Sequence, residues 1–192
     1  MTSQLKLLLV RHSETRVDPD IPADQWRLTE DGRARCGPMA EQLRSHSIRR
    51  VVASREPKAV ETAELVGRHL GLDVDVIDGL HEQDRTGVPF YDDVATFRAR
   101  VAKLFEHPDQ VVLGNKTAND ALNRFVRALD EVVTSYPPEK VSIVTHATVM
   151  SLYIASRTKV DGYSYWKRLG MPAFAVLSLP NLRLIETVES MA

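Results

Sequence analysis

The residues best suited to chemistry are two histidines and an arginine, which directly follow short apolar runs. Arg11 and His12 follow the run Leu5–Val10, and His146 follows the run Val141–Thr145. If both runs are parallel strands, their carboxyl ends lie at one edge of a sheet, where open α/β sheets bind ligands. A single histidine after a strand is more often a solvated loop residue. Two in matching positions, one beside an arginine and one opening a helix, favour a shared site.

Apolar runs and amphipathic segments alternate along the rest of the chain, which indicates an α/β fold. The predicted strands are Leu5–Val10, Arg50–Ala53, Leu72–Ile77, Val141–Thr145, Ala173–Leu179 and Leu182–Val188. The predicted helices cover about Thr29–Ser45, Pro57–Leu70, Tyr91–Glu106, Asn119–Tyr136 and Ala147–Ser156. We therefore expect a three-layer sandwich, in which a mostly parallel central sheet carries helices on both faces, and a single domain over residues 1–192.

Local signals place the ends of the first two helices. Thr29 is followed by Glu30 and Asp31, which puts a hydroxyl and two acids where a helix start leaves N–H groups unpaired. Pro57 suits the first turn of the second helix, and Gly71 suits its C-terminal cap. The first-helix residues expected to face inward are Ala34, Met39, Ala40 and Leu43.

Charge and cysteine content narrow the classes of function. Lys and Arg number 25 and Asp and Glu number 26, a formal net charge of −1, so there is no global basic field for nucleic acid or an anionic membrane. The single cysteine, Cys36, cannot form an intramolecular disulfide. Leu5–Val10 is too short for a signal-peptide core or a membrane span, and no later segment is long enough. A cytoplasmic protein is expected.

Five motifs, in order along the chain, resemble those of the histidine phosphatase superfamily, which includes the cofactor-dependent phosphoglycerate mutases. Arg11-His12-Ser13-Glu14-Thr15 resembles the Arg-His-Gly-Glu/Ala signature of this superfamily. The other four segments are Leu28–Gly32, Ser54–Ala63, Leu80-His81-Glu82 and Val144-Thr145-His146-Ala147. Each motif alone is weak evidence, whereas five in the correct order are strong. The resemblance implies a phosphoglycerate mutase-like fold.

The resemblance also implies the chemistry. His12 is the nucleophile that forms a phosphohistidine, and Glu82 protonates the leaving alkoxide and later activates water. Asp84 is a second candidate for the role of the acid. The alternative for Glu82 is a glutamate on the protein surface without a catalytic role. Arg11, His146 and the backbone N–H groups after His146 offset the charge of the phosphoryl group. The predicted function is metal-independent hydrolysis of a phosphomonoester.

Three positions depart from the family pattern. Ser13 and Ala147 stand where glycine is common; both are small, so the backbone still approaches phosphate and both count as substrate-binding. Lys58 stands where the family has an arginine, and a lysine offers a point charge in place of a planar fork. Either Lys58 keeps the phosphate role or Arg55 reaches in from the preceding loop. The plain alternative for Lys58 is a solvated charge on a helix face.

The sequence leaves three alternative functions open: a mutase, a phosphate-binding protein and a protein phosphohistidine phosphatase. In mutases of the family the acid is followed by Arg-x-Tyr-Gly, whereas Glu82 is followed by Gln83-Asp84-Arg85-Thr86, which disfavours a mutase. A phosphate-binding protein without catalysis has only Lys58 in its support. Phosphatases of protein phosphohistidine often lack the acid, so a working Glu82 favours alcohol phosphates.

The expected partner is a small phosphorylated metabolite or a phosphoprotein. The substrate is set within about residues 80–119, and Arg16 and Arg85 are either readers of an anionic substrate or surface charges. A homodimer would form through the final hairpin or a strand edge. No metal is expected, because His12 and His146 are accompanied by cations. No cofactor is expected, since no Walker loop or dinucleotide fingerprint is present.

Overall fold

The computed structural model describes residues 5–137 and 140–191, and a six-stranded mixed sheet forms its centre. The strands are β1 (Lys6–Arg11), β2 (Arg50–Ser54), β3 (Val74–Ile77), β4 (Val141–Thr145), β5 (Ala173–Ser178) and β6 (Leu184–Val188). Their order is β3-β2-β4-β1-β5-β6. The first four in this order are parallel, while β5 runs antiparallel to β1 and β6 antiparallel to β5. The sheet is therefore mostly parallel, as expected.

The register of the two central strands positions the site. Arg11 of β1 pairs with Thr145 of β4, so the next residues, His12 and His146, leave neighbouring strands at the same edge. The N–H of His12 also donates to the carbonyl oxygen of Thr145 at 3.0 Å. The convergence of the two histidines follows directly from this parallel pairing.

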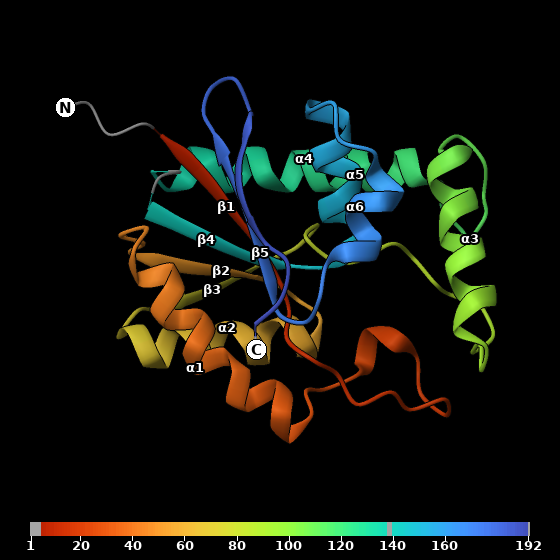
Figure 1. The fold of residues 1–192 in the computed structure, drawn as a ribbon, viewed down its shortest axis with the longest axis horizontal. Coiled ribbons are helices and arrows are strands. Elements are labelled where there is room, and N and C mark those ends of the chain that lie inside the picture. The colour runs from red at the N-terminus through yellow and green to blue at the C-terminus, as the bar shows by residue number, and fades with distance from the viewer. Residues whose placement is uncertain (1–4, 138–139, 192) are drawn as a thin grey trace.

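Helices cover both faces of the sheet (Figure 1). They are α1 (Glu30–Arg44), α2 (Pro57–Leu70), α3 (Val94–Glu106), α4 (Ala118–Ser135), α5 (Ala147–Arg157) and α6 (Gly162–Arg168), with a short 3-10 helix, η1 (Ala23–Gln25). The side chains of β1 alternate between the two faces of the sheet. Leu8 and Val10 pack against α1 and α2, whereas Leu7 and Leu9 pack on the side of α4, α5 and α6. Helix α3 lies beyond the end of this second layer and packs against α6.

Side-chain and glycine caps fix several helix ends. The hydroxyl of Thr29 accepts the N–H of Gly32 at 2.9 Å, as predicted for the start of α1. Gly71 ends α2 in the left-handed conformation at φ 69°. Thr117 and Asp120 form a reciprocal capping box at the start of α4. These local interactions are readable from the sequence, so the bounds of α2 match their prediction.

Four details differ from the sequence prediction. Ala34 is exposed because the buried face of α1 follows Gly32, Cys36, Met39, Ala40 and Leu43, and Ala34 lies about 200° around the helix from Gly32. Helix α3 begins at Val94, because the carboxylate of Asp93 caps the N–H groups of Ala95 and Thr96. The strand expected from Leu72 begins at Val74. Helix α6 and η1 were not predicted.

No helix in the described residues is both long and apolar enough to cross a membrane.

Candidate active site

A cavity of about 1490 Å³ opens where the carboxyl ends of β1, β2 and β4 meet the loops that follow them. Its inner residues include His12, Glu56, Lys58 and Glu82, with His146 buried directly behind. We call these five residues the phosphate end of the cavity. Four of the five were predicted from sequence to belong to a site, and Glu56 was not.

The ring of His12 is held in the tautomer that a nucleophile needs. Its Nδ1 lies 2.8 Å from the carbonyl oxygen of Ser13, an acceptor only, so Nδ1 carries the proton and donates it. The other nitrogen, Nε2, makes no hydrogen bond within the described residues and lies on the side of the cavity. Burial, His146, Lys58 and Arg11 together lower the pKa of His12 well below its usual value. The imidazole is therefore neutral, with a lone pair on Nε2.

His146 is fully buried and lies beside His12, with 5.1 Å between the ring centroids. Its Nε2 lies 2.8 Å from the hydroxyl oxygen of Ser54, and that hydroxyl accepts the N–H of Glu56 at 3.3 Å. Because Ser54 is fully buried, its hydroxyl proton needs an acceptor, and Nε2 is the one in reach. His146 then carries its own proton on Nδ1, which has no partner in the described part of the chain. Burial and the charge of Lys58 lower the pKa of His146 well below its usual value.

The guanidinium of Arg11 is anchored on the far side of His12. Its Nη1 donates to the carbonyl oxygens of Leu169 and Gly170, while its Nε is buried and has no partner in the described residues. Burial is the main cause that lowers the pKa of Arg11 to about 10, so the group remains a cation at neutral pH. Arg11 thus presents a fixed positive charge with donors to spare.

Glu82 caps helix α5, the helix that follows His146. Its carboxylate accepts the N–H groups of Thr148 at 3.0 Å and Val149 at 3.1 Å, and that of its neighbour Gln83 at 2.9 Å. Burial raises the pKa of Glu82, but His146, Arg85 and the backbone donors lower it, and the net shift is downward. This differs from the sequence expectation in two ways: the N–H groups of Thr148 and Val149 donate to a carboxylate, and the pKa of Glu82 is lowered.

The first N–H of α5, that of Ala147, is not part of this cap. It makes no hydrogen bond in residues 5–137 and 140–191, and Ala147 lines the cavity. One backbone donor at the start of α5 therefore remains for an anion.

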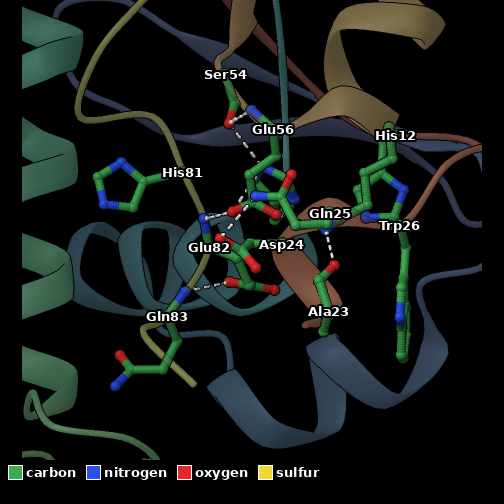
Figure 2. A network of polar contacts seen from close by, with 12 residues as sticks. His12, Ala23, Asp24, Gln25, Trp26, Ser54, Glu56, His81, Glu82 and Gln83 are labelled. Carbon is green, nitrogen blue, oxygen red and sulfur yellow. Dashed lines mark hydrogen bonds and ion pairs between the residues drawn. The ribbon is translucent and has the colours of Figure 1, made fainter. Parts of the chain in front are cut away.

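Lys58 is buried and paired, not solvated. Only 7% of its side chain is exposed; its Nζ lies 2.5 Å from a carboxylate oxygen of Glu56 and donates to the carbonyl oxygen of Ala23 at 2.6 Å. Figure 2 shows this network at the phosphate end, with Ala23 and Glu56 among the labelled residues. Arg55 points elsewhere: its side chain is 60% exposed and pairs with Asp78 at 3.1 Å. Of the two cations proposed from sequence, Lys58 is the one built into the site.

Glu56 links most of the phosphate end and is the residue that sequence reasoning missed. Besides Lys58, its carboxylate accepts the N–H of Glu82 at 2.7 Å, and one oxygen lies 3.5 Å from Nε2 of His146. In the sequence it precedes Pro57 at a helix start, where an acid is unremarkable. Lys58, two residues later, stands at the expected phosphate-binding position. This lysine was the one feature of the sequence that pointed to an ion-pair partner for Glu56.

Ser13 contacts the protein on both of its polar groups. Its N–H donates to the hydroxyl of Thr62 at 3.0 Å, and its own hydroxyl donates to the carbonyl of Gly32 at 2.7 Å. Its carbonyl oxygen orients His12. A contact from Ser13 to substrate stays a prediction.

Apolar side chains line another part of the cavity. Trp26 and Phe90 meet edge to face at 6.5 Å, joining two loops that are distant in sequence. Val17, Ile21, Phe90 and Val94 are 41–59% exposed and line the cavity. We call these five residues the outer wall.

Together with Arg11, the phosphate end offers two cations, two neutral imidazoles, the Glu56 carboxylate that is paired with Lys58, and the Glu82 carboxylate. Among the described residues, no group of three or more His, Cys, Asp and Glu side chains is placed to hold a metal ion. A neutral imidazole with a free lone pair, a fixed guanidinium and a nearby carboxylate are side chains of the kind that phosphoryl transfer to nitrogen requires.

The chain belongs to the histidine phosphatase superfamily (branch 1), which it matches over residues 7–180. This confirms the family, the fold class and the assignment to an enzyme superfamily made from the five motifs. A curated relative is the uncharacterized phosphatase PhoE of Bacillus subtilis (strain 168), which is 26% identical over 165 residues, 80% of this chain and 76% of PhoE.

Solved structures of phosphatases share the fold. A mycobacterial glucosyl-3-phosphoglycerate phosphatase in complex with VO3 has a TM-score of 0.76 at 21% identity, covering 96% of this chain and 99% of that one. The phosphoserine phosphatase of Entamoeba histolytica in complex with 3-phosphoglyceric acid has a TM-score of 0.73 at 16% identity, covering 97% and 98%. At these identities the likeness concerns the fold.

Proposed function

We propose that this protein hydrolyses phosphomonoesters of small metabolites through a phosphohistidine on His12. The observation that carries the proposal is the state of His12: a buried, neutral imidazole whose Nδ1 proton is held by Ser13, and whose Nε2 has no hydrogen-bond partner among the described residues. The family and the phosphatases with the same fold support it. A cytoplasmic location and a homodimer stay predictions.

In the first half-reaction, Nε2 of His12 attacks phosphorus and the bond from phosphorus to the ester oxygen breaks. The charge on the phosphoryl oxygens is offset by Arg11, by the third N–H of Lys58 and by the N–H of Ala147. Nδ1–H of His146 is a further donor on the same side. The alkoxide takes a proton from Glu82.

Glu82 must first gain that proton. Its pKa is lowered in the empty site, but an arriving phosphate dianion adds negative charge beside it and favours the protonated form. In the second half-reaction Glu82, now ionised, takes a proton from water while the water oxygen attacks phosphorus. The bond to Nε2 breaks, and inorganic phosphate and neutral His12 are released.

Hydrolysis is favoured over a mutase reaction. The segment after Glu82 is Gln83-Asp84-Arg85-Thr86, which lacks the mutase-like sequence, and the relatives described above are phosphatases. A phosphate-binding protein without catalysis would need a damaged nucleophile or acid. His12 and Glu82 are instead both placed at the cavity.

The experiment compares wild type with His12→Ala on para-nitrophenyl phosphate from pH 5 to 8, with a metal chelator present. His107→Ala is the matched control, since His107 is exposed at the end of α3. We expect turnover in wild type and in the control, and none in His12→Ala. Brief reaction with ³²P-labelled substrate should leave acid-labile, alkali-stable label on the wild-type protein and on the control, and none on His12→Ala. Full activity in His12→Ala would overturn the mechanism.

A further inference from the structure

Residues 83–86 follow the acid and are held more firmly than a surface loop. The side-chain amide of Gln83 donates to the carbonyl oxygens of Leu113 at 3.2 Å and Lys116 at 2.8 Å. Gly114 approaches so closely that a Cβ there would lie 2.0 Å from the carbonyl oxygen of Asp84. Asp84 in turn accepts the N–H of Thr86 at 2.8 Å. The backbone that carries Arg85 is therefore fixed relative to the cavity.

The side chain of Arg85 is positioned but has no anionic partner. Its guanidinium lies 4.9 Å from the ring centroid of Phe97, and Arg85 lines the cavity together with Arg11 and His12. Its Nε is buried without a hydrogen bond, and in the described ranges no carboxylate lies within ion-pair distance of the guanidinium. An arginine held on an aromatic face with its donors unused is suited to bind a planar or tetrahedral oxyanion.

Other cations around the inner cavity are engaged with protein groups. Lys58 is paired with Glu56, Arg55 with Asp78, and Arg124 donates to the carbonyl oxygens of Gly79, His81 and Glu82. Arg11 donates to two carbonyl groups. Arg85 is thus a half-buried guanidinium that has no hydrogen-bond or ion-pair partner in the described residues.

We propose that Arg85 binds the phosphoryl oxygens as the second guanidinium of the site, together with Arg11. The inference rests on the proposed phosphatase function and deepens it. It names Arg85 as the residue that supplies the planar pair of N–H donors, which the ammonium group of Lys58 lacks. The charge of Arg85 also lowers the pKa values of Arg11, Glu82 and His146, which places it within electrostatic reach of the groups around His12.

Inorganic phosphate is the probe, because it contains the phosphoryl oxygens and nothing else. Its dissociation constant is measured by isothermal titration and by the shift in melting temperature of wild type, Arg85→Ala, Arg85→Lys and Arg127→Ala. Arg127 is the matched control, an exposed arginine that lines the same cavity. We expect Arg85→Ala to bind phosphate about 10- to 100-fold more weakly. Arg85→Lys should lie in between, and Arg127→Ala should match wild type.

A second readout separates binding from folding. In Arg85→Ala, added guanidinium ion should restore part of the ester-hydrolysis rate, and a purely structural arginine would not give this rescue. Phosphate binding within twofold of wild type in Arg85→Ala overturns the proposal, and a rise in KM alone would then assign Arg85 to the alcohol part of the substrate. That result would leave the His12 mechanism intact. A wild-type protein that binds no phosphate overturns this proposal together with the phosphate site.

Discussion

The phosphate end and the outer wall of the same cavity are built on opposite principles. At the phosphate end, His12, Glu56, Lys58 and His146 are each less than 7% exposed, and most of their polar atoms have a named partner. Four of the five outer-wall residues are more than 40% exposed and apolar. The first region lies on strand ends, on helix starts and on the loop that carries Glu82, and the second lies on loops and on the first residue of α3.

This difference assigns separate roles to the two regions. Phosphoryl transfer needs charges fixed before the reaction, which a buried network between regular elements provides. Recognition of the alcohol part of the substrate needs only a contact surface of sufficient area. Loops supply such a surface, and their sequences vary readily. Changes at the phosphate end should therefore alter kcat or stability, whereas changes at the outer wall should alter KM.

The largest effect is expected for Glu82→Gln with an alkyl phosphate as substrate. An alkoxide leaves only with a proton, so kcat should fall by about 10²- to 10⁴-fold. With para-nitrophenyl phosphate, whose leaving group needs no proton, the first half-reaction should change much less. Asp84→Asn is the control and should keep the alkyl phosphate rate. If Asp84→Asn instead lost the alkyl ester selectively, the acid would be Asp84.

The pair of Glu56 and Lys58 should affect stability most. Glu56→Gln leaves a buried ammonium without its carboxylate, and loss of one partner of a buried pair costs about 3–5 kcal/mol. The double variant Glu56→Gln with Lys58→Met should recover part of that loss. Urea unfolding at pH 7 of both single variants and the double variant measures the coupling. Strictly additive losses would show that the two side chains do not depend on each other.

The two buried histidines should make the protein less stable in mild acid. Their folded pKa values lie well below that of an unfolded histidine, so below about pH 6.5 the unfolded chain binds more protons than the native one. Stability is then lost as the pH falls, with a slope of up to about 1.4 kcal/mol per pH unit for each histidine. His146→Asn should flatten the curve between pH 5 and 8. The exposed His107→Asn should not, and an equal slope in wild type and His146→Asn would contradict the assignment.

The smallest effect is expected at the outer wall. Phe90→Ala removes the ring that meets Trp26, and such an aromatic pair contributes about 0.5–1.5 kcal/mol. KM for phenyl phosphate should rise a few-fold, with kcat unchanged. Val111→Ala, an exposed apolar residue away from the cavity, is the control. A fall in kcat for Phe90→Ala would remove the distinction between the two regions.

Elements bounded by local chemistry were predictable. Pro57 and Gly71 bound α2, and the apolar runs of β1 and β4 end directly before His12 and His146. Helix α6 was missed because seven residues are too few for an amphipathic stripe to emerge.

The site was predictable where it depends on strand ends and not where it depends on contacts between distant elements. The register of β1 and β4 brings His12 and His146 together, as their positions implied. Glu56 could not be recognised, because the burial of its carboxylate depends on Lys58, on His146 and on the backbone of Glu82. The downward shift in the pKa of Glu82 depends first on His146 and Arg85 and then on the backbone N–H groups of α5, and no local pattern encodes these contacts.

The cap that Glu82 places on α5 has an electrostatic consequence. A helix start carries a partial positive charge of about half a unit, which is commonly offered to an incoming anion. In this protein an internal carboxylate already neutralises most of it, through Thr148 and Val149. Under the proposed function, an arriving phosphate therefore meets mainly side-chain cations and a single backbone amide. Its affinity should depend on ionic strength and on arginine substitutions more than on the length or orientation of the helix.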